Sequence, residues 1–301
     1  DLGNGFAVGF ILENGFKADD GTLADSSRIF NREASVSLYS PYGQFSFGRI
    51  GSINQGTSSW GKAGLLSAFG TSYTTYVAQV GNFAKADTVR DNMIAYMSPT
   101  FAGINVYAQY SMGDSNGTEN KPTSNRYYAL GASYINGPVL LYGAVDSINY
   151  KADTTRPNQD DSLTVTLGGS YDFGVAKVFL VGQYLDEAAL SSISSTVNKL
   201  ALDGSAFRFK GWGASLSASI PAFGGKFLAG VAYDDAETAD SETIDADLTR
   251  YIVSLGYEYN LSKRTNVYAV ASYMQDEIEP AGGSSIEPSA TAVKFGLRHK
   301  F

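Results

Sequence analysis

The sequence contains no cysteine and only one histidine and two tryptophans in 301 residues. The lack of cysteine excludes disulfides and thiolate metal ligands, and it fits an oxidising compartment. A single histidine argues against hydrolases and zinc enzymes, because their sites use histidine as a general base or as a ligand. The one candidate, His299, lies on the apolar face of an alternating segment. We therefore expect no enzyme activity and no metal site built on histidine.

Positive charge is also scarce, with 22 Lys and Arg against 30 Asp and Glu and a net charge of −8. This acidic balance argues against nucleic acid as a partner. Long apolar runs are missing too, since the charge-free stretch 63–84 is interrupted by Gly, Ser and Thr and predicts no membrane-spanning helix. Acidic residues concentrate in 234–247, which we interpret as a solvated outer loop. A Ca²⁺ site formed by these carboxylates is an alternative, although the segment has no EF-hand spacing.

Glycine, tyrosine and phenylalanine are abundant, at 33, 20 and 17 residues. Runs of about ten residues carry an apolar side chain at every second position, which is the length and the period of a strand that crosses a bilayer. The clearest runs cover 104–111, 163–173, 211–220, 250–259, 266–273 and 293–301. Tyrosines recur at the ends of the apolar sets, where an aromatic girdle would lie.

Connections between the runs alternate between short turns and long polar segments, as in an up-and-down barrel. We count about fourteen strands and one domain, 1–301. The connection at 50–90 is far longer than the others, and five glycines between 51 and 70 allow it to bend back. The sequence therefore predicts an all-β transmembrane antiparallel barrel in which loop 50–90 folds into the lumen.

Several motifs in order along the chain carry a family resemblance. They include Asp1-Leu2-Gly3-Asn4-Gly5-Phe6, Phe30-Asn31-Arg32, Phe47-Gly48-Arg49, Arg90-Asp91-Asn92, Ser98-Pro99-Thr100-Phe101 and Gly296-Leu297-Arg298-His299-Lys300-Phe301. With these motifs the chain resembles the general diffusion porins of Gram-negative outer membranes, particularly the neisserial and betaproteobacterial group. The resemblance implies a sixteen-stranded porin barrel, of which this chain would carry fourteen strands and lack the first hairpin.

The resemblance also implies partners and a location. Porins of this group lie in the outer membrane, contact its lipid and lipopolysaccharide, form homotrimers and are inserted by the barrel assembly machinery. In this chain the residues that match the C-terminal assembly signature are Phe295, Leu297, His299 and Phe301.

The same resemblance implies a constriction formed by the third long loop and a ladder of arginines. Arg32 and Arg90 match ladder positions, and Arg49 is a weaker match. Lys62 would add a basic group, and Glu13 and Asp87 would oppose it. The loop lacks the family's acidic tip and instead carries Trp60, Leu65, Leu66, Phe69, Tyr73 and Tyr76. These side chains either pack the loop on the wall, which we favour, or narrow the pore.

We therefore expect a passive channel for small hydrophilic solutes and ions, without a cofactor, with weak selectivity tilted toward anions. A substrate-selective porin is the first alternative. A structural or adhesive outer-membrane barrel is the second, and an outer-membrane hydrolase is the least supported reading.

Overall fold

The structure is a computed structural model, and it describes residues 1–54, 58–70, 73, 78, 83, 89–113, 119–151, 159–190, 207–242 and 244–300. Apart from one short 3₁₀-helix, η1 (Ala63–Leu66), the named elements are strands. Within the described ranges, no helix has the length and the apolar composition that a membrane span requires. The strands are β1 (Ala7–Glu13), β2 (Glu33–Ser40), β3 (Gly43–Gly51), β4 (Val89–Met97), β5 (Ile104–Ser111), β6 (Arg126–Asn136), β7 (Val139–Asn149), β8 (Leu163–Asp172), β9 (Lys177–Ala188), β10 (Phe209–Ala222), β11 (Gly225–Thr238), β12 (Ala246–Asn260), β13 (Thr265–Pro280) and β14 (Ser289–His299).

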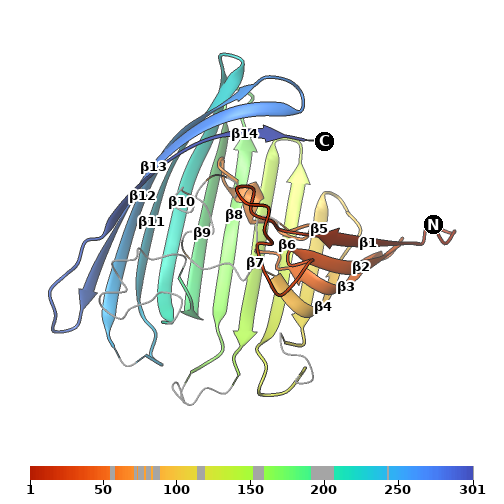
Figure 1. Cartoon of the computed structure of the whole chain (residues 1–301), viewed down its shortest axis with the longest axis horizontal. Helices are drawn as coiled ribbons and strands as arrows, with labels where there is room; N and C mark the ends of the chain where they lie inside the picture. The colour runs from red at the N-terminus through yellow and green to blue at the C-terminus, as the bar shows by residue number, and fades with distance from the viewer. Residues whose placement is uncertain are drawn as a thin grey trace.

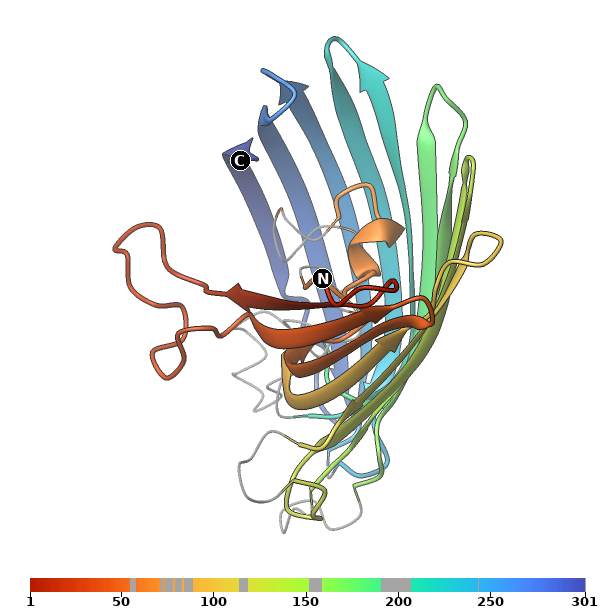
Figure 2. The same cartoon turned by 90° about the vertical axis from the view of Figure 1, so that its right-hand side faces the viewer.

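The described residues form one sheet of 14 strands in the order β1 to β14. Each strand pairs antiparallel with its neighbours in the sequence, for example Leu216 with Val231 and Val253 with Tyr273. The sheet curves into a deep trough, with β1–β4 bending across one side of it (Figures 1 and 2). The all-β class, the up-and-down order and the count of fourteen strands expected from the sequence are confirmed.

Period-two alternation divides the sheet into an outer and an inner face. On β8, Leu163 and Leu167 are 39% and 64% exposed, whereas Thr164 and Thr166 are 9% and 0% exposed. The same division holds on β12, where Val253 and Leu255 are exposed and Ser254 is buried. An apolar outer face and a polar inner face suit a strand with lipid on one side and a water-filled lumen on the other.

Short turns join the strands at one end of the sheet and need unusual backbone angles there. At the β2–β3 turn Gly43 has φ 122°, a conformation that L side chains rarely adopt. A Cβ at this position would also lie 2.8 Å from the Tyr96 ring. The turn therefore requires glycine at position 43, and glycine is one of the residues that favour turns.

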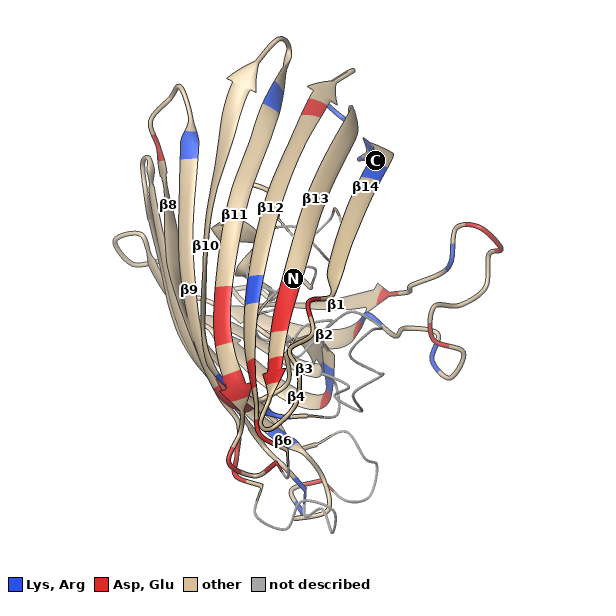
Figure 3. Cartoon of the chain, turned by 90° about the vertical axis from the view of Figure 1, so that its left-hand side faces the viewer, with Lys and Arg blue, Asp and Glu red and all other residues tan. Residues whose placement is uncertain are grey.

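The acidic segment 234–247 is not one loop, which corrects the interpretation from composition. Asp234 and Glu237 lie in β11 and Asp247 lies in β12, so the connection itself covers only the residues between Thr238 and Ala246. Cross-strand pairing explains the extension, because Asp234 lies opposite Arg250, and Arg250 lies opposite Asp276. Figure 3 shows this as a basic band on β12 between acidic bands on β11 and β13.

Because Leu167 faces outward, a charged side chain at this position should destabilise the fold, by an amount that depends on its depth in the bilayer. Leu167→Lys should lower the free energy of unfolding by about 2–4 kcal/mol, because it places an ammonium group in hydrocarbon near the bilayer midplane. Urea titration in lipid vesicles measures this loss. The control Leu261→Lys makes the same change in the β12–β13 turn, where the leucine is 56% exposed. Equal losses in both variants would contradict the assigned orientation.

Candidate functional site

The described residues of the segment between β3 and β4 (residues 52–88) lie against the inner face of the sheet. Its described residues run inside the trough, and η1 lies over β8 and β9 (Figure 2). We call it the β3–β4 segment. It lies on the concave side of the sheet, opposite the apolar outer face. It is therefore the element of the described structure best placed to narrow a passage.

Apolar side chains of this segment are buried against the wall. Trp60 and Leu66 are 3% and 1% exposed and join a cluster with inward residues of β3 to β7 and of β9. Phe69 and Tyr73 pack with Leu228 and Val270 on the other side of the trough. The aromatic side chains named from the sequence therefore pack the segment onto the wall, with Leu65 exposed and Tyr76 outside the described residues.

Hydrogen bonds fix the segment at intervals along its length. The Asn54 amide donates to Asp146 Oδ2 at 2.7 Å, and the backbone N–H of Ile53 donates to Gln109 Oε1 at 2.9 Å. Further along, Ala68 N–H donates to Ser217 Oγ at 3.0 Å and Ala78 N–H donates to Ser254 Oγ at 3.1 Å. The polar inner face thus supplies partners for a backbone that has no sheet partner of its own.

Of the predicted constriction residues, Arg32 and Glu13 form a pair with each other. Arg32 Nε lies 2.6 Å from Glu13 Oε1, and the two side chains are 38% and 39% exposed. Glu13 ends β1 and Arg32 directly precedes β2, so the pair lies at the long-loop end of these strands. Arg49, on β3, forms an ion pair with Asp91 at 2.6 Å and donates to the Asn31 carbonyl.

Arg90 and Lys62 each lie over a tyrosine ring of the wall. Arg90 is 5% exposed, and its guanidinium lies 5.6 Å from the centre of the Tyr127 ring. Lys62 Nζ lies 5.1 Å from the centre of the Tyr107 ring, and burial lowers the pKa of this lysine. Asp87 lies outside the described residues. The structure therefore brings together some of the predicted set, but it does not gather all of it at one point.

Sequence reasoning missed two clusters in which two cations share one carboxylate. In the Asp91 cluster, Arg28 Nη2 and Arg49 Nη1 lie 2.9 and 2.6 Å from Asp91. In the Glu258 cluster, Lys226 Nζ and Arg298 Nη1 lie 2.7 and 3.1 Å from Glu258. Alternation shows that Glu258 faces inward, but its partners come from β11 and β14, and only the strand register brings them together.

The β3–β4 segment reaches the Glu258 cluster through Tyr73. The Tyr73 hydroxyl donates to Glu258, and Lys294 Nζ donates to the Tyr73 carbonyl. Arg298 also lies over the Tyr73 ring, 5.2 Å from its centre. Burial, followed by the hydrogen bond to Glu258, raises the pKa of Tyr73, so the hydroxyl stays a donor at neutral pH.

Exposure differs between the two signs of charge on the inner face. Lys226 and Arg298 have side chains 41% and 33% exposed, whereas the side chain of Glu258 is 4% exposed. Asp276 is 0% exposed and is held by Arg250, and Glu33 is 0% exposed and accepts from Ser35 and Ser59. The carboxylates of Glu258, Asp276 and Glu33 are thus satisfied by donors, and at Glu258 the groups that meet water are basic.

The acidic residues near the β11–β12 connection line a shallow hollow. Its carboxylates come from Glu237, Asp240, Asp245, Asp247 and Glu279. In the described part of the chain, however, no three Asp, Glu or His side chains are grouped closely enough to hold a metal ion. The geometry gives no support to the Ca²⁺ alternative.

The C-terminal strand presents its apolar face outward. Phe295 and Leu297 are 76% and 64% exposed, and the exposed His299 shares a hydrogen bond with Thr265. Phe301 lies outside the described residues.

A family model described as Gram-negative porin matches residues 1–278. The chain belongs to the Gram-negative porin family. An outer membrane porin protein of Bordetella pertussis is 30% identical over 100% of this chain and 80% of its own length. Outer membrane porin protein 32 of Delftia acidovorans is 28% identical over 100% of this chain and 82% of its own. The major outer membrane protein P.IB of Neisseria gonorrhoeae is 26% identical, covering 100% and 81%.

Solved porins share the fold of this porin. The anion-selective porin from Comamonas acidovorans superposes with a TM-score of 0.66 at 24% identity, covering 100% of this chain and 86% of that one. OmpT of Vibrio cholerae in its trimer form gives 0.57 at 17% identity, covering 88% and 79%. The family resemblance, the porin-type barrel and the outer-membrane location expected from the sequence are confirmed. The protein is an outer-membrane general porin, and family and fold point to a channel rather than an enzyme.

Because the β3–β4 segment is held by hydrogen bonds to the wall, removing the Tyr142 hydroxyl should loosen it. Tyr142 OH lies 3.2 Å from Ile53 O and 3.1 Å from Asn54 Oδ1. Tyr142→Phe leaves these acceptors without their buried donor, which costs about 1–3 kcal/mol. Amide hydrogen exchange over 50–66 should become faster. The control Tyr96→Phe removes an exposed hydroxyl that donates to Tyr42 O, and it should leave this exchange unchanged. Unchanged exchange in both variants would contradict the proposed anchoring.

Proposed function

We propose that this porin is a weakly anion-selective diffusion channel whose field comes from the exposed cations of the Glu258 cluster. The observation that carries the proposal is the arrangement at Glu258, where two partly exposed cations meet one buried carboxylate. This cluster holds two cations and one acid, so it presents a net positive charge to the inner face. The overall charge of −8 therefore misrepresents the charge that a solute meets on the inner face.

Geometry explains why the selectivity should be weak. The side chains of Lys226 and Arg298 are 41% and 33% exposed, so water and salt screen them. At physiological ionic strength, screening confines such fields to about 8 Å. Acidic residues at the β11–β12 connection concentrate cations at that mouth and partly offset the basic wall. The name of the Comamonas porin, anion-selective, is in line with this proposal for a protein of the same fold.

The charge proposal is tested by removing one cation from the Glu258 cluster. Lys226→Gln leaves one cation, Arg298, for the Glu258 carboxylate, so the reversal potential in a KCl gradient should move toward cation preference. The move should be larger in 0.1 M than in 1 M salt, because the screening length falls from about 10 Å to about 3 Å. Planar-bilayer recording measures both effects.

Lys263→Gln is the matched control, because it removes an exposed lysine in the β12–β13 turn. It should leave the reversal potential nearly unchanged. A shift in this control as large as that of Lys226→Gln, or no shift in Lys226→Gln, would refute the assignment.

We further propose that the β3–β4 segment sets the width of the pore. Deleting 59–70 removes η1 and the buried Trp60, Leu66 and Phe69, so single-channel conductance should rise severalfold. Deleting 16–27, an equal length from the exposed β1–β2 connection, serves as the control and should not raise it. Both variants are first checked for the heat-modifiable gel migration of a folded barrel. If the first deletion folds with unchanged conductance, the segment does not limit flux.

A homotrimer is the assembly that we propose, together with contacts to outer-membrane lipid and lipopolysaccharide. One structural relative was solved in a trimer form. The exposed Phe295 and Leu297 would lie against lipid or be recognised by the barrel assembly machinery during insertion. Passive flux requires no cofactor. Native mass spectrometry of protein extracted from outer membranes should show three copies, and monomer alone would remove the trimer from the proposal.

A further inference from the structure

An inward row of polar side chains crosses six strands at one level of the sheet. Cross-strand pairing joins Thr166 to Gln183, Gln183 to Gly213, Gly213 to Asp234, Asp234 to Arg250, and Arg250 to Asp276. The side-chain row is interrupted only at Gly213. We call the space above this glycine the Gly213 gap.

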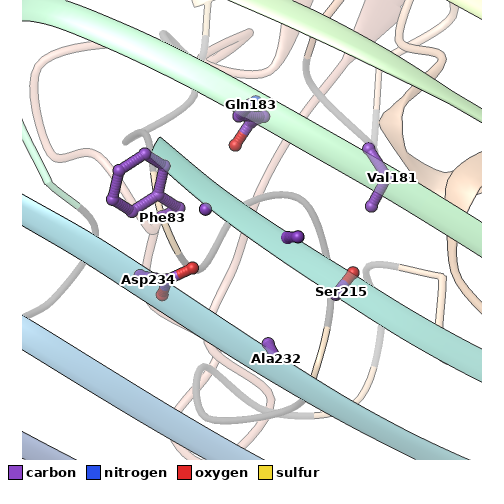
Figure 4. A pocket seen from close by; sticks show the side chains of 8 residues that line it. Phe83, Val181, Gln183, Ser215, Ala232 and Asp234 are labelled. Atoms are coloured by element: carbon purple, nitrogen blue, oxygen red, sulfur yellow. The ribbon is translucent and has the colours of Figure 1, made fainter. Parts of the chain in front are cut away.

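The Gly213 gap is a cavity whose walls are partly polar and partly apolar. Gln183, Ser215 and Asp234 line it, and the ring of Phe83 from the β3–β4 segment lies beside it (Figure 4). The volume that the centre of a water molecule can occupy in this cavity is about 10 Å³, which is room for one water-sized particle. A Cβ at position 213 would clash with Asp234 Oδ1 and lie 2.7 Å from Phe83 Cγ, so the cavity depends on glycine.

Three buried atoms that line this cavity have no hydrogen-bond partner among the described residues. They are Gln183 Oε1, Ser215 Oγ and Asp234 Oδ2. Their residues are 8%, 6% and 3% exposed. Two of the three atoms are acceptors only, and the hydroxyl can also accept, so an occupant must be a donor or a cation.

Among the described residues, the charges facing Asp234 are Arg250 and Asp276. Arg250 Nε and Nη2 lie 2.7 and 3.0 Å from the two oxygens of Asp276, which makes a bidentate pair with no net charge. Within the described row, one negative charge therefore remains at Asp234. A buried carboxylate with no compensating cation is costly, and a water molecule would satisfy its hydrogen bonds without removing its charge.

We propose that the Gly213 gap binds one dehydrated monovalent cation of about the size of a water molecule, such as K⁺ or ammonium, through Asp234 Oδ2, Gln183 Oε1 and Ser215 Oγ. The cation completes the polar row and neutralises Asp234 beneath Phe83. It thereby stabilises the part of the wall on which the β3–β4 segment rests. This inference does not depend on the proposed selectivity, because its tests measure unfolding and diffraction rather than flux.

Thermal unfolding in detergent tests the site by linkage, since a ligand that binds only the folded state raises the unfolding temperature. At pH 8 and equal concentrations, the unfolding temperature should be several degrees higher in KCl or NH₄Cl than in choline chloride, whose cation is too large for the gap. Asp234→Asn and Gly213→Ala should abolish this difference, the first by removing the charge and the second by filling the space.

Gly182→Ala is the matched control, because the Cβ it adds would lie 3.8 Å from the nearest heavy atom. It should keep the full dependence on K⁺. No dependence in the unmodified protein, or a dependence that persists in Asp234→Asn, would overturn the proposal.

Crystals grown with thallium(I), a substitute for K⁺ with strong anomalous scattering, test the site without any variant. An anomalous peak between Asp234, Gln183 and Ser215 would confirm the cation. Ordered density at the same position without an anomalous signal would identify water and overturn the proposal.

Discussion

The requirement that every backbone polar group be satisfied within a bilayer determines this structure. The described strands meet that requirement by pairing with each other, and pairing with period two gives each strand one lipid face and one inner face. Leu167 and Thr166 show the result, adjacent in sequence and opposite in exposure. The inner face is polar as a consequence. Ser217 and Ser254 on it accept hydrogen bonds from the backbone of the β3–β4 segment, so docking of that segment follows from the same alternation.

Charge on the inner face follows a second rule, which is that buried carboxylates need donors. Glu258, Asp276 and Glu33 are almost fully buried, and each is held by basic or hydroxyl groups. Lys226 and Arg298 keep their heads nearer water than the Glu258 that they hold, since lysine and arginine bury their stems more readily than their charges. Net charge counted over the chain gives each group equal weight. A permeating ion responds instead to exposed groups, and on this wall many of those are basic.

The sequence predicts the sheet well because alternation is local. It places β8 and β12 correctly from their apolar positions alone, and turn residues such as Gly43 mark where strands meet. It fails where local signals conflict, as in 234–247, where dense acids read as a loop although period two continues through Asp234. That segment is ordered by Arg250 and Asp276, which are distant in sequence. For the same reason the candidate site was only partly predictable. Arg49 belongs to the predicted constriction set. Its pairing with Asp91, which Arg28 shares, depends on loop and register geometry.

The central claim is that the β3–β4 segment lies on the inner face of the sheet, and paired cysteines test it most directly. The chain has no cysteine, so Ala78→Cys with Ser254→Cys introduces the only two thiols. Ala78 N–H lies 3.1 Å from Ser254 Oγ, whereas the adjacent Val253 is 50% exposed on the outer face. On mild oxidation of intact outer membranes, the 78–254 pair should form a disulfide and a 78–253 pair should not. Efficient cross-linking of 78 to 253, or of neither position, would contradict the account.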